Sequence, residues 1–289
     1  MTTLVTGSGT LVGKSISLYL SSKSKIISTY RSSFPKNLSK IKNIKVCRLD
    51  LNKKINLSFT FNTLIHCASA IPDYQLSKKK LLKTNVQGFR KILSLCRKNK
   101  VKYIVLLSSV SVYGKIKSNR INEKTPTYLL DDTYGNSKLQ MEMDLINYAK
   151  KEKINFLILR LPAILGKNSS HNFLSKLVKS IKEGGRKEFL LKNSNFKLNN
   201  FIHIKTLSEV VYYGIKKKLN GLFILGSKNP IKLKNIINKI KDYKKISVTY
   251  QNDRYPFNID INKALRWKIP LRKTSCEITK FLEENFRSK

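Results

Sequence analysis

A tyrosine, a lysine and an upstream serine form the combination in this chain that is best suited to acid–base chemistry. Tyr134 and Lys138 follow the spacing Tyr-x-x-x-Lys, which places both side chains on one face of a helix. An ammonium group held there favours the phenolate form of the tyrosine. Ser109 stands just after an apolar run and could hold a substrate oxygen beside them. Such a set can move a proton to or from a carbinol or carbonyl oxygen while a cofactor carries the hydride.

The Tyr-x-x-x-Lys spacing alone has little weight in a lysine-rich chain. It begins at Tyr19, Tyr74, Tyr113, Tyr134, Tyr212 and Tyr213. Its ordinary explanation is a solvated helix face. Tyr134 differs from the others because it follows a predicted strand, a Ser-Ser end and a loop, and because it opens a long amphipathic pattern. This context selects Tyr134 and Lys138 as the candidate catalytic pair.

The net charge of +41 is spread along the chain. The lysine clusters are Lys78-Lys79-Lys80, Lys150-Lys151, Lys216-Lys217-Lys218 and Lys244-Lys245. They fall in predicted helices and connections, as solvated faces do, whereas nucleic-acid-binding proteins gather their cations and stacking aromatics on one surface. We expect no nucleic-acid partner, and the charge should simply attract anionic cofactors and substrates.

The cysteines, the histidines and the lengths of the apolar segments exclude further classes. The residues concerned are Cys47, Cys67, Cys96, Cys276, His66, His171 and His203. They lack metal-ligand spacing, so we predict free thiols in a reducing compartment and no metal site. The chain shows no apolar segment that predicts a membrane span and no signal sequence. The expectation is a cytoplasmic protein without membrane contact.

Short apolar runs alternate with helical patterns over much of the chain, which indicates a parallel sheet wrapped by helices. Predicted strands span Thr3–Thr6, Lys25–Arg31, Ile44–Leu49, Thr63–His66, Lys102–Leu107 and Asn155–Arg160. Predicted helices span Leu11–Ser22, Lys79–Asn99 and Tyr134–Lys151. Right-handed crossovers between such strands build a doubly wound α/β sheet of the Rossmann type. We expect this domain to cover residues 1–166 and 200–226, and residues 167–289 to form mainly a smaller substrate-binding lobe.

A glycine-rich turn follows the first predicted strand. Gly7, Gly9 and Gly13 allow the backbone to turn sharply and to approach a pyrophosphate at the start of the next helix. Thr10, Leu11 and Val12 complete this predicted dinucleotide-binding segment.

The second predicted strand ends in Arg31 and Ser32, where an acidic residue would bind the ribose hydroxyls of NAD. A guanidinium beside a hydroxyl suits a 2′-phosphate. The alternative is an ordinary exposed arginine in a basic protein. We predict NADP(H) in preference to NAD(H).

These segments resemble the extended short-chain dehydrogenase/reductases, the group of NAD(P)-dependent sugar-nucleotide epimerases, dehydratases and reductases. Further matching segments are Asp50-Leu51, His66-Cys67-Ala68-Ser69, Asn85-Val86-Gln87-Gly88, Arg160-Leu161-Pro162, Phe201-Ile202-His203-Ile204 and Gly221-Leu222-Phe223. The resemblance covers nearly the whole chain, and the order of the segments makes it specific. The additional cofactor-binding residues that it implies are Asp50, Leu51, His66, Ala68, Asn85 and Pro162.

The resemblance also implies roles for the catalytic set. Tyr134 would be the general acid/base, Lys138 would favour the phenolate and bond the nicotinamide ribose, and Ser109 would orient the substrate oxygen. Members of the group often dimerise through two long helices, here predicted over residues 79–99 and 134–151, so the resemblance implies a homodimer.

Three departures from the family pattern bear on the cofactor turn, the substrate and the reaction. Thr10 replaces a usual glycine, so we expect it to cap the following helix. Asn199-Asn200 replaces an Arg-Asp pair, which removes one cation for a substrate diphosphate and leaves Arg254 as a substitute candidate. Val110 and Ser111 stand where dehydratases carry acidic residues, so a 4,6-dehydratase is disfavoured.

Three functional hypotheses follow for a small-molecule substrate. The first is an NAD(P)-dependent oxidoreductase or epimerase acting on a nucleotide-linked sugar. The second is an NADPH-dependent reductase of a smaller carbonyl compound. The third is a non-catalytic NAD(P)-binding regulator, which would have no need of the combination of Ser109, Tyr134 and Lys138.

Overall fold

The computed structural model describes residues 2–72, 76–116, 118–127, 133–184, 188–192, 195–251 and 257–287. The chain folds into two compact units. The first, here called the sheet unit, comprises Met1–Lys115, Thr125–Arg160 and Ser208–Phe223. The second unit comprises Ile116–Lys124, Leu161–Leu207 and Ile224–Lys289. The chain therefore passes between the units several times.

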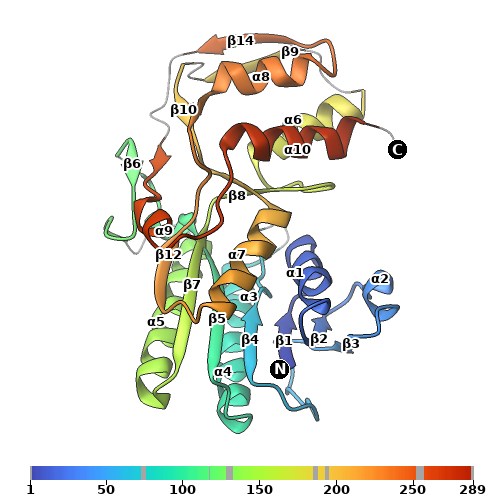
Figure 1. Ribbon diagram of the computed structural model, residues 1–289, viewed down its shortest axis with the longest axis vertical. Helices are drawn as coiled ribbons and strands as arrows, with labels where there is room; N and C mark the ends of the chain where they lie inside the picture. Colours follow the sequence, from blue (N-terminus) through green and yellow to red (C-terminus); the bar gives the residue numbers. More distant parts are fainter. Residues whose placement is uncertain are drawn as a thin grey trace. The chain divides into compact units, whose positions relative to one another are not determined.

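The sheet unit is built on a seven-stranded parallel sheet with the order β12-β7-β5-β4-β1-β2-β3 (Figure 1). The strands are β1 (Thr2–Thr6), β2 (Lys25–Tyr30), β3 (Ile44–Arg48), β4 (Thr63–His66), β5 (Tyr103–Ser109), β7 (Asn155–Leu161) and β12 (Gly221–Ile224). The order reverses between β1 and β4, which is where ligands bind in sheets of this type. The predicted Rossmann-type sheet is confirmed, and each predicted strand lies within two residues of its observed bounds.

Helices cover both faces of this sheet. They are α1 (Leu11–Ser21), α2 (Lys36–Ser39), α3 (Lys78–Leu82), α4 (Gly88–Lys98), α5 (Thr133–Glu152) and α7 (Ile204–Lys216). Successive side chains of a strand point to opposite faces. On β7, Ile158 joins the core beneath α4 and α5, whereas Leu157 lies against Gly214 of α7. The covering of both faces explains why the strands are nearly continuous apolar runs.

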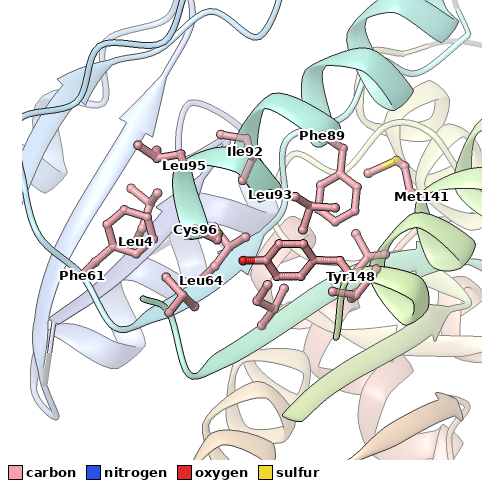
Figure 2. Close-up of a cluster of buried hydrophobic side chains, with 14 of the residues drawn as sticks. Leu4, Phe61, Leu64, Phe89, Ile92, Leu93, Leu95, Cys96, Met141 and Tyr148 are labelled. Carbon is pink, nitrogen blue, oxygen red and sulfur yellow. The ribbon is translucent and has the colours of Figure 1, made fainter. Parts of the chain in front are cut away.

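The core that holds α5 against the sheet is drawn in Figure 2. Phe89 and Ile92 of α4 and Met141 and Tyr148 of α5 meet Leu4 of β1 in one buried cluster. Each large side chain buried in this way contributes about 1.5–3 kcal/mol. The cluster fixes the helix that begins beside Tyr134.

The predicted helix over residues 79–99 is wrong in one respect, because a π-helical segment, Lys83–Gln87, separates α3 from α4. In this segment the Thr84 hydroxyl donates to the Lys80 carbonyl at 2.9 Å and to Asn52 Oδ1 at 3.1 Å. Asn85, which is fully buried, bonds the backbone of Ala70. The wider turn of a π-helix lets Asn85 point inward, and such segments are frequent at functional sites.

The second unit contains short strands and helices around its own core. Its elements are β6 (Arg120–Ile121), β8 (Ala163–Leu165), α6 (Phe173–Lys182), β9 (Glu188–Lys192), β10 (Lys197–Leu198), β11 (Phe201–His203), β13 (Ile231–Lys232), α8 (Leu233–Lys241), β14 (Ser247–Gln251), β15 (Asn258–Ile259), α9 (Asn262–Arg266) and α10 (Thr274–Phe286). Leu174, Phe201, Ile236 and Phe281 are among the residues of its buried cluster. Across both units, the described helices include none that is long and apolar enough to cross a membrane.

Candidate active site

The glycine turn joins β1 to α1 and brings the backbone into close contact with neighbouring segments. Gly7 has φ +76, and a Cβ atom there would lie 2.8 Å from the Cα atom of Ala68. A Cβ atom on Gly9 would lie 2.9 Å from the carbonyl oxygen of Ser33, and one on Gly13 would collide with the carbonyl of Gly7. Only glycine fits these positions, so the turn forms a narrow backbone cradle of the kind that holds a pyrophosphate.

Thr10 is the N-cap of α1, as the sequence predicts. Its hydroxyl accepts a hydrogen bond from the Gly13 N–H at 3.4 Å and donates to the Gly7 carbonyl at 2.8 Å. The helix then begins at Leu11 and Val12. The first turn of a helix presents backbone N–H groups and the positive end of the helix dipole, which together favour an anion.

Two arginines stand at the ends of β2 and β3. Arg31 and Ser32 are exposed directly after β2. Arg48, the last residue of β3, pairs in register with Tyr30 and donates from its Nε to the Arg31 carbonyl at 3.1 Å. Sequence reasoning missed Arg48 as a second cation, although its place at the end of a predicted strand could have indicated it.

Asp50 and Leu51 follow β3 and lie beside the same edge. The Asp50 carboxylate accepts a hydrogen bond from the Asn52 N–H at 2.9 Å. Leu51 is buried and lies so close to Gly88 that a Cβ atom there would be 2.7 Å from the Leu51 Cβ. A cavity of about 250 Å³ lies among residues 48–50 and 53–57, so Asp50 has open space beside it.

His66 is fully buried at the end of β4 and is held by Thr6. The Thr6 hydroxyl oxygen accepts from the Cys67 and Ala68 N–H groups, each at 3.2 Å, and lies 2.9 Å from His66 Nδ1. The hydroxyl therefore donates to Nδ1, which places the imidazole proton on Nε2. Burial, reinforced by the charge of Lys138, lowers the pKa of His66 to about 3, so the ring stays neutral.

Asn85 clamps the segment after β4. Its Oδ1 accepts from the Ala70 N–H at 2.7 Å, and its Nδ2 donates to the Ala70 carbonyl and to the Ser137 hydroxyl, each at 3.0 Å. Both amide hydrogens are used in these contacts. The structure thus gives Asn85 a tethering position that connects the segment after β4 with the first turns of α5.

The candidate catalytic residues converge where β5 ends and α5 begins. The Lys138 ammonium is buried, donates to the Leu107 carbonyl of β5 at 3.0 Å and lies 5.8 Å from the centre of the Tyr134 ring. Ser109 is the last residue of β5, and its hydroxyl oxygen accepts from the Ser111 N–H at 3.1 Å. The lysine thereby joins the face that carries Tyr134 to the strand that ends in Ser109.

The charge of Lys138 is poised near neutral pH. Burial lowers its pKa from 10.5 to about 8, while Cys67 and Glu142 act in the opposite direction. Strongly shifted pKa values of buried groups cluster at functional sites.

A buried ion pair lies one helical turn beyond Lys138. Arg160 of β7 donates through its Nε and Nη2 to the Glu142 carboxylate, with Nη2 2.7 Å from Oε2. Arg160 also donates to the Tyr113 hydroxyl at 2.9 Å, and the Ser108 hydroxyl donates to Glu142. Sequence reasoning missed Glu142, because a single glutamate inside a helical pattern carries no local signal.

The remaining predicted site residues belong to the second unit or fall outside the described residues. Pro162 is buried between β7 and β8 and belongs to the second unit. In the same unit both side-chain amide atoms of Asn199 bond the backbone of Ile259, each at 2.8 Å. Arg254 lies outside the described residues, as does Tyr74 of one Tyr-x-x-x-Lys pair.

The four cysteines are free thiols, of which Cys96 is buried and Cys276 is exposed. Within the part of the chain that the structure describes, no group of three or more histidine, cysteine or acidic side chains could hold a metal ion.

Comparison with known proteins bears on the family and the fold of the chain. Residues 3–224 match the model of the NAD dependent epimerase/dehydratase family. The N-acetyl-alpha-D-glucosaminyl-diphospho-ditrans,octacis-undecaprenol 4-epimerase of Escherichia coli O157:H7 is 30% identical over 164 residues, which cover 56% of this chain and 47% of that protein. The match spans about half the length of such curated relatives.

Two solved structures illustrate the likeness of fold. UDP-glucuronic acid 4-epimerase from Bacillus cereus, in complex with NAD, superimposes with a TM-score of 0.82 at 20% identity, covering 98% of this chain and 96% of that one. ADP-L-glycero-D-manno-heptose-6-epimerase from Helicobacter pylori gives a TM-score of 0.82 at 21% identity, covering 99% and 96%. At such identities the likeness extends to the fold alone. The match over residues 3–224 decides the family: the chain belongs to the NAD dependent epimerase/dehydratase family.

Proposed function

We propose that this protein is an NAD(P)-dependent epimerase or oxidoreductase that acts on a carbinol or ketone carbon of a nucleotide-linked sugar. One observation carries the proposal. Lys138 is buried between the Tyr134 ring and the Leu107 carbonyl, close to the end of the strand that terminates in Ser109. A buried ammonium is costly, and here it faces a phenol that could exchange a proton with substrate.

Each member of the catalytic set has a proposed task. Tyr134 takes the proton from a carbinol oxygen, or returns it to a carbonyl oxygen. Lys138 favours the phenolate through its charge and keeps two of its three donors for other partners after bonding Leu107. Ser109 holds the substrate oxygen by a hydrogen bond, so that the oxygen stays within reach of the tyrosine.

The cofactor would be held by the carboxyl edge of the sheet. The turn at Gly7, Gly9 and Gly13 fits a pyrophosphate, because the glycines allow the tight backbone contacts of the turn and the first turn of α1 presents N–H groups to an anion. Asp50 and Leu51 would contact the adenosine, with the open space beside Asp50 available to it. When bound, the nicotinamide dinucleotide supplies or accepts the hydride.

Arg31 and Arg48 support NADP(H) as the cofactor. Two guanidinium groups and the Ser32 hydroxyl stand at adjacent strand ends, where the cofactor's 2′-position is recognised in such sheets. Arginine binds phosphate through fixed, charge-assisted hydrogen bonds. His66, which is neutral, and Asn85, which bonds the backbone of Ala70, would line the site without adding charge to it.

The proposed substrate class is supported by the solved structures of similar fold, several of which are named as nucleotide-sugar epimerases. An epimerase agrees better than a 4,6-dehydratase with Val110 and Ser111, since neither residue supplies the acid that dehydration needs. A reductase of a smaller carbonyl compound is the second candidate. It is favoured by Asn199, whose amide is occupied with Ile259 where the family pattern has an arginine.

A homodimer is the proposed assembly. Leu82 of α3 and Met143 and Ile146 of α5 are exposed apolar side chains on helices that pack together. An isologous interface between two copies would bury them.

The test is a panel of UDP- and ADP-linked sugars incubated with the protein and either NAD⁺ or NADP⁺, with products followed by NMR. We expect a new epimer without net change in the cofactor. Consumption of NADPH with a small carbonyl compound, and inactivity on every nucleotide sugar, would favour the reductase. If the folded protein binds a dinucleotide yet converts no member of either substrate class, the proposal is wrong.

A further inference from the structure

A buried polar cluster lies behind the candidate catalytic residues and joins four elements of the sheet unit. Its members are Ser108 of β5, Tyr113 of the 3₁₀ turn Val110–Tyr113, Glu142 of α5 and Arg160 of β7. The side chains of Glu142 and Arg160 are only 2% and 6% exposed. Replacing a buried ion pair with apolar residues is often neutral or stabilising, so stability alone gives little reason for one here.

We propose that Glu142 and Arg160 are a positioning pair for the set of Ser109, Tyr134 and Lys138. Glu142 holds the end of β5 through the Ser108 hydroxyl, and Arg160 holds the turn that follows Ser109 through the Tyr113 hydroxyl. The inference deepens the proposed function and rests on it.

Hydrogen bonds connect the pair to the chain on both sides of Ser109. Ser108 is the neighbour of Ser109, and Tyr113 ends the 3₁₀ turn that starts immediately after it. Arg160 reaches this turn twice, by the hydrogen bond to the Tyr113 hydroxyl and by its guanidinium carbon 4.9 Å from the centre of the Tyr113 ring. The backbone on both sides of Ser109 is therefore fixed by one ion pair, which leaves the serine hydroxyl little freedom to move away from its task.

The pair also places a carboxylate near Lys138. Glu142 and Lys138 are four residues apart on α5, so they lie on the same face of the helix. Lys138 also faces the Tyr134 ring on α5, His66 and Cys67 at the end of β4, and the Leu107 carbonyl of β5. Glu142 is the carboxylate near Lys138, and the charge of Arg160 balances it. Glu142 therefore favours the charged form of Lys138, while the ion pair of Glu142 and Arg160 has no net charge.

This arrangement gives the two single variants opposite effects. In Glu142→Gln the unbalanced guanidinium of Arg160 remains, so Lys138 should lose its proton at lower pH. In Arg160→Gln the unbalanced carboxylate remains, so Lys138 should keep its proton to higher pH. We expect shifts of about one pH unit in each direction. The double variant Glu142→Leu/Arg160→Met, which removes both charges, should titrate between the two single variants and above Glu142→Gln, and this comparison replaces Arg160→Gln if that variant does not fold.

The experiment is NMR titration of protein labelled with [ε-¹³C]lysine, in the absence of cofactor and substrate. The signal of Lys138 is assigned by its loss in Lys138→Met. The matched control is Asp144→Asn, which removes another carboxylate from α5 that also binds an arginine, Arg90, at 2.8 Å. In this control variant the pKa of Lys138 should equal that of the wild type.

Two further readouts complete the test. With the substrate found for the wild type, Glu142→Gln should lower kcat more than it raises KM, and the alkaline limb of its pH profile should move in the same direction as the NMR titration. If folded Glu142→Gln shows the wild-type lysine titration and pH profile, the pair is only structural and the inference is wrong. If instead the lysine titrations shift as expected but the wild type binds no dinucleotide, the proposed function fails while the linkage between the pair and Lys138 stands.

Discussion

The Lys138 ammonium lies 5.8 Å from the centre of the Tyr134 ring and is bonded to the Leu107 carbonyl of β5. This contact ties the first turns of α5 to the strand that ends in Ser109. The core beneath α5, which includes Met141 and Tyr148, holds the helix in the position that the contact requires. Packing of the helix therefore determines the geometry of the proposed acid–base group.

Tyr134→Phe removes the proposed proton donor without changing the packing of the ring. We expect turnover to fall by about 10²–10⁴-fold, the usual contribution of a positioned acid or base, while dinucleotide affinity stays near that of the wild type. Steady-state kinetics and a binding titration measure the two effects.

The matched control is Tyr19→Phe, which removes a hydroxyl from another Tyr-x-x-x-Lys pair, whose tyrosine lies on α1. Its turnover should remain that of the wild type. Equal losses in both variants would show that Tyr134 has no special role.

Lys138 should give turnover an alkaline limit. Because burial lowers its pKa to about 8, kcat/KM for the free enzyme should fall as pH rises through about 8, where the ammonium loses its proton. In Lys138→Arg the guanidinium stays charged, so a variant with residual turnover should lack this limb. A limb at the same pH in the arginine variant would assign the titration to another group.

Lys138 should also make folding stability depend on pH. Folding lowers its pKa from 10.5 to about 8, so the unfolded chain binds more protons between these values and the contribution of Lys138 to the unfolding free energy rises with pH across that window. Urea denaturation of the wild type and Lys138→Met at pH 8 and pH 9.5 measures it. From pH 8 to pH 9.5, we expect the unfolding free energy of the wild type to rise by about 1–2 kcal/mol relative to that of Lys138→Met. A difference that stays constant or moves the other way would contradict the buried, charged lysine.

Arg31 and Arg48 should set the choice of cofactor. Each charge-assisted bond to a phosphate contributes about 1.5–3 kcal/mol, so Arg31→Ala and Arg48→Ala should each weaken NADPH binding by roughly 10–100-fold and leave NADH binding nearly unchanged. Arg97→Ala, on α4 and paired with Glu152, is the control. Equal losses for NADPH and NADH would remove the basis for an NADP preference.

Much of this molecule could be predicted from its sequence, because the signals are local. The alternation of apolar runs and helical patterns located the strands, and Thr10 was correctly expected to cap α1. The π-helical segment could not be predicted, since it depends on the contacts of Asn85 with Ala70 and Ser137.

Long-range contacts account for what the sequence did not reveal. Glu142 meets Arg160 through the packing of α5 on the sheet, and Arg48 reaches Arg31 through strand register. Residues 116–124 belong to the second unit, where β6 pairs with β15. No local pattern in these segments indicates such partners.

The central claim is that the glycine turn and the carboxyl edge of the sheet hold a nicotinamide dinucleotide. The most direct measurement is mass spectrometry of small molecules released by denaturing the freshly purified protein, followed by binding titrations of the empty protein with NADPH and NADH. We expect a retained or readily bound dinucleotide, with NADPH preferred, and its loss in Gly13→Ala but not in the neighbouring variant Lys14→Ala, because a Cβ atom on Gly13 collides with the Gly7 carbonyl. A wild-type protein that retains and binds neither dinucleotide would contradict the account.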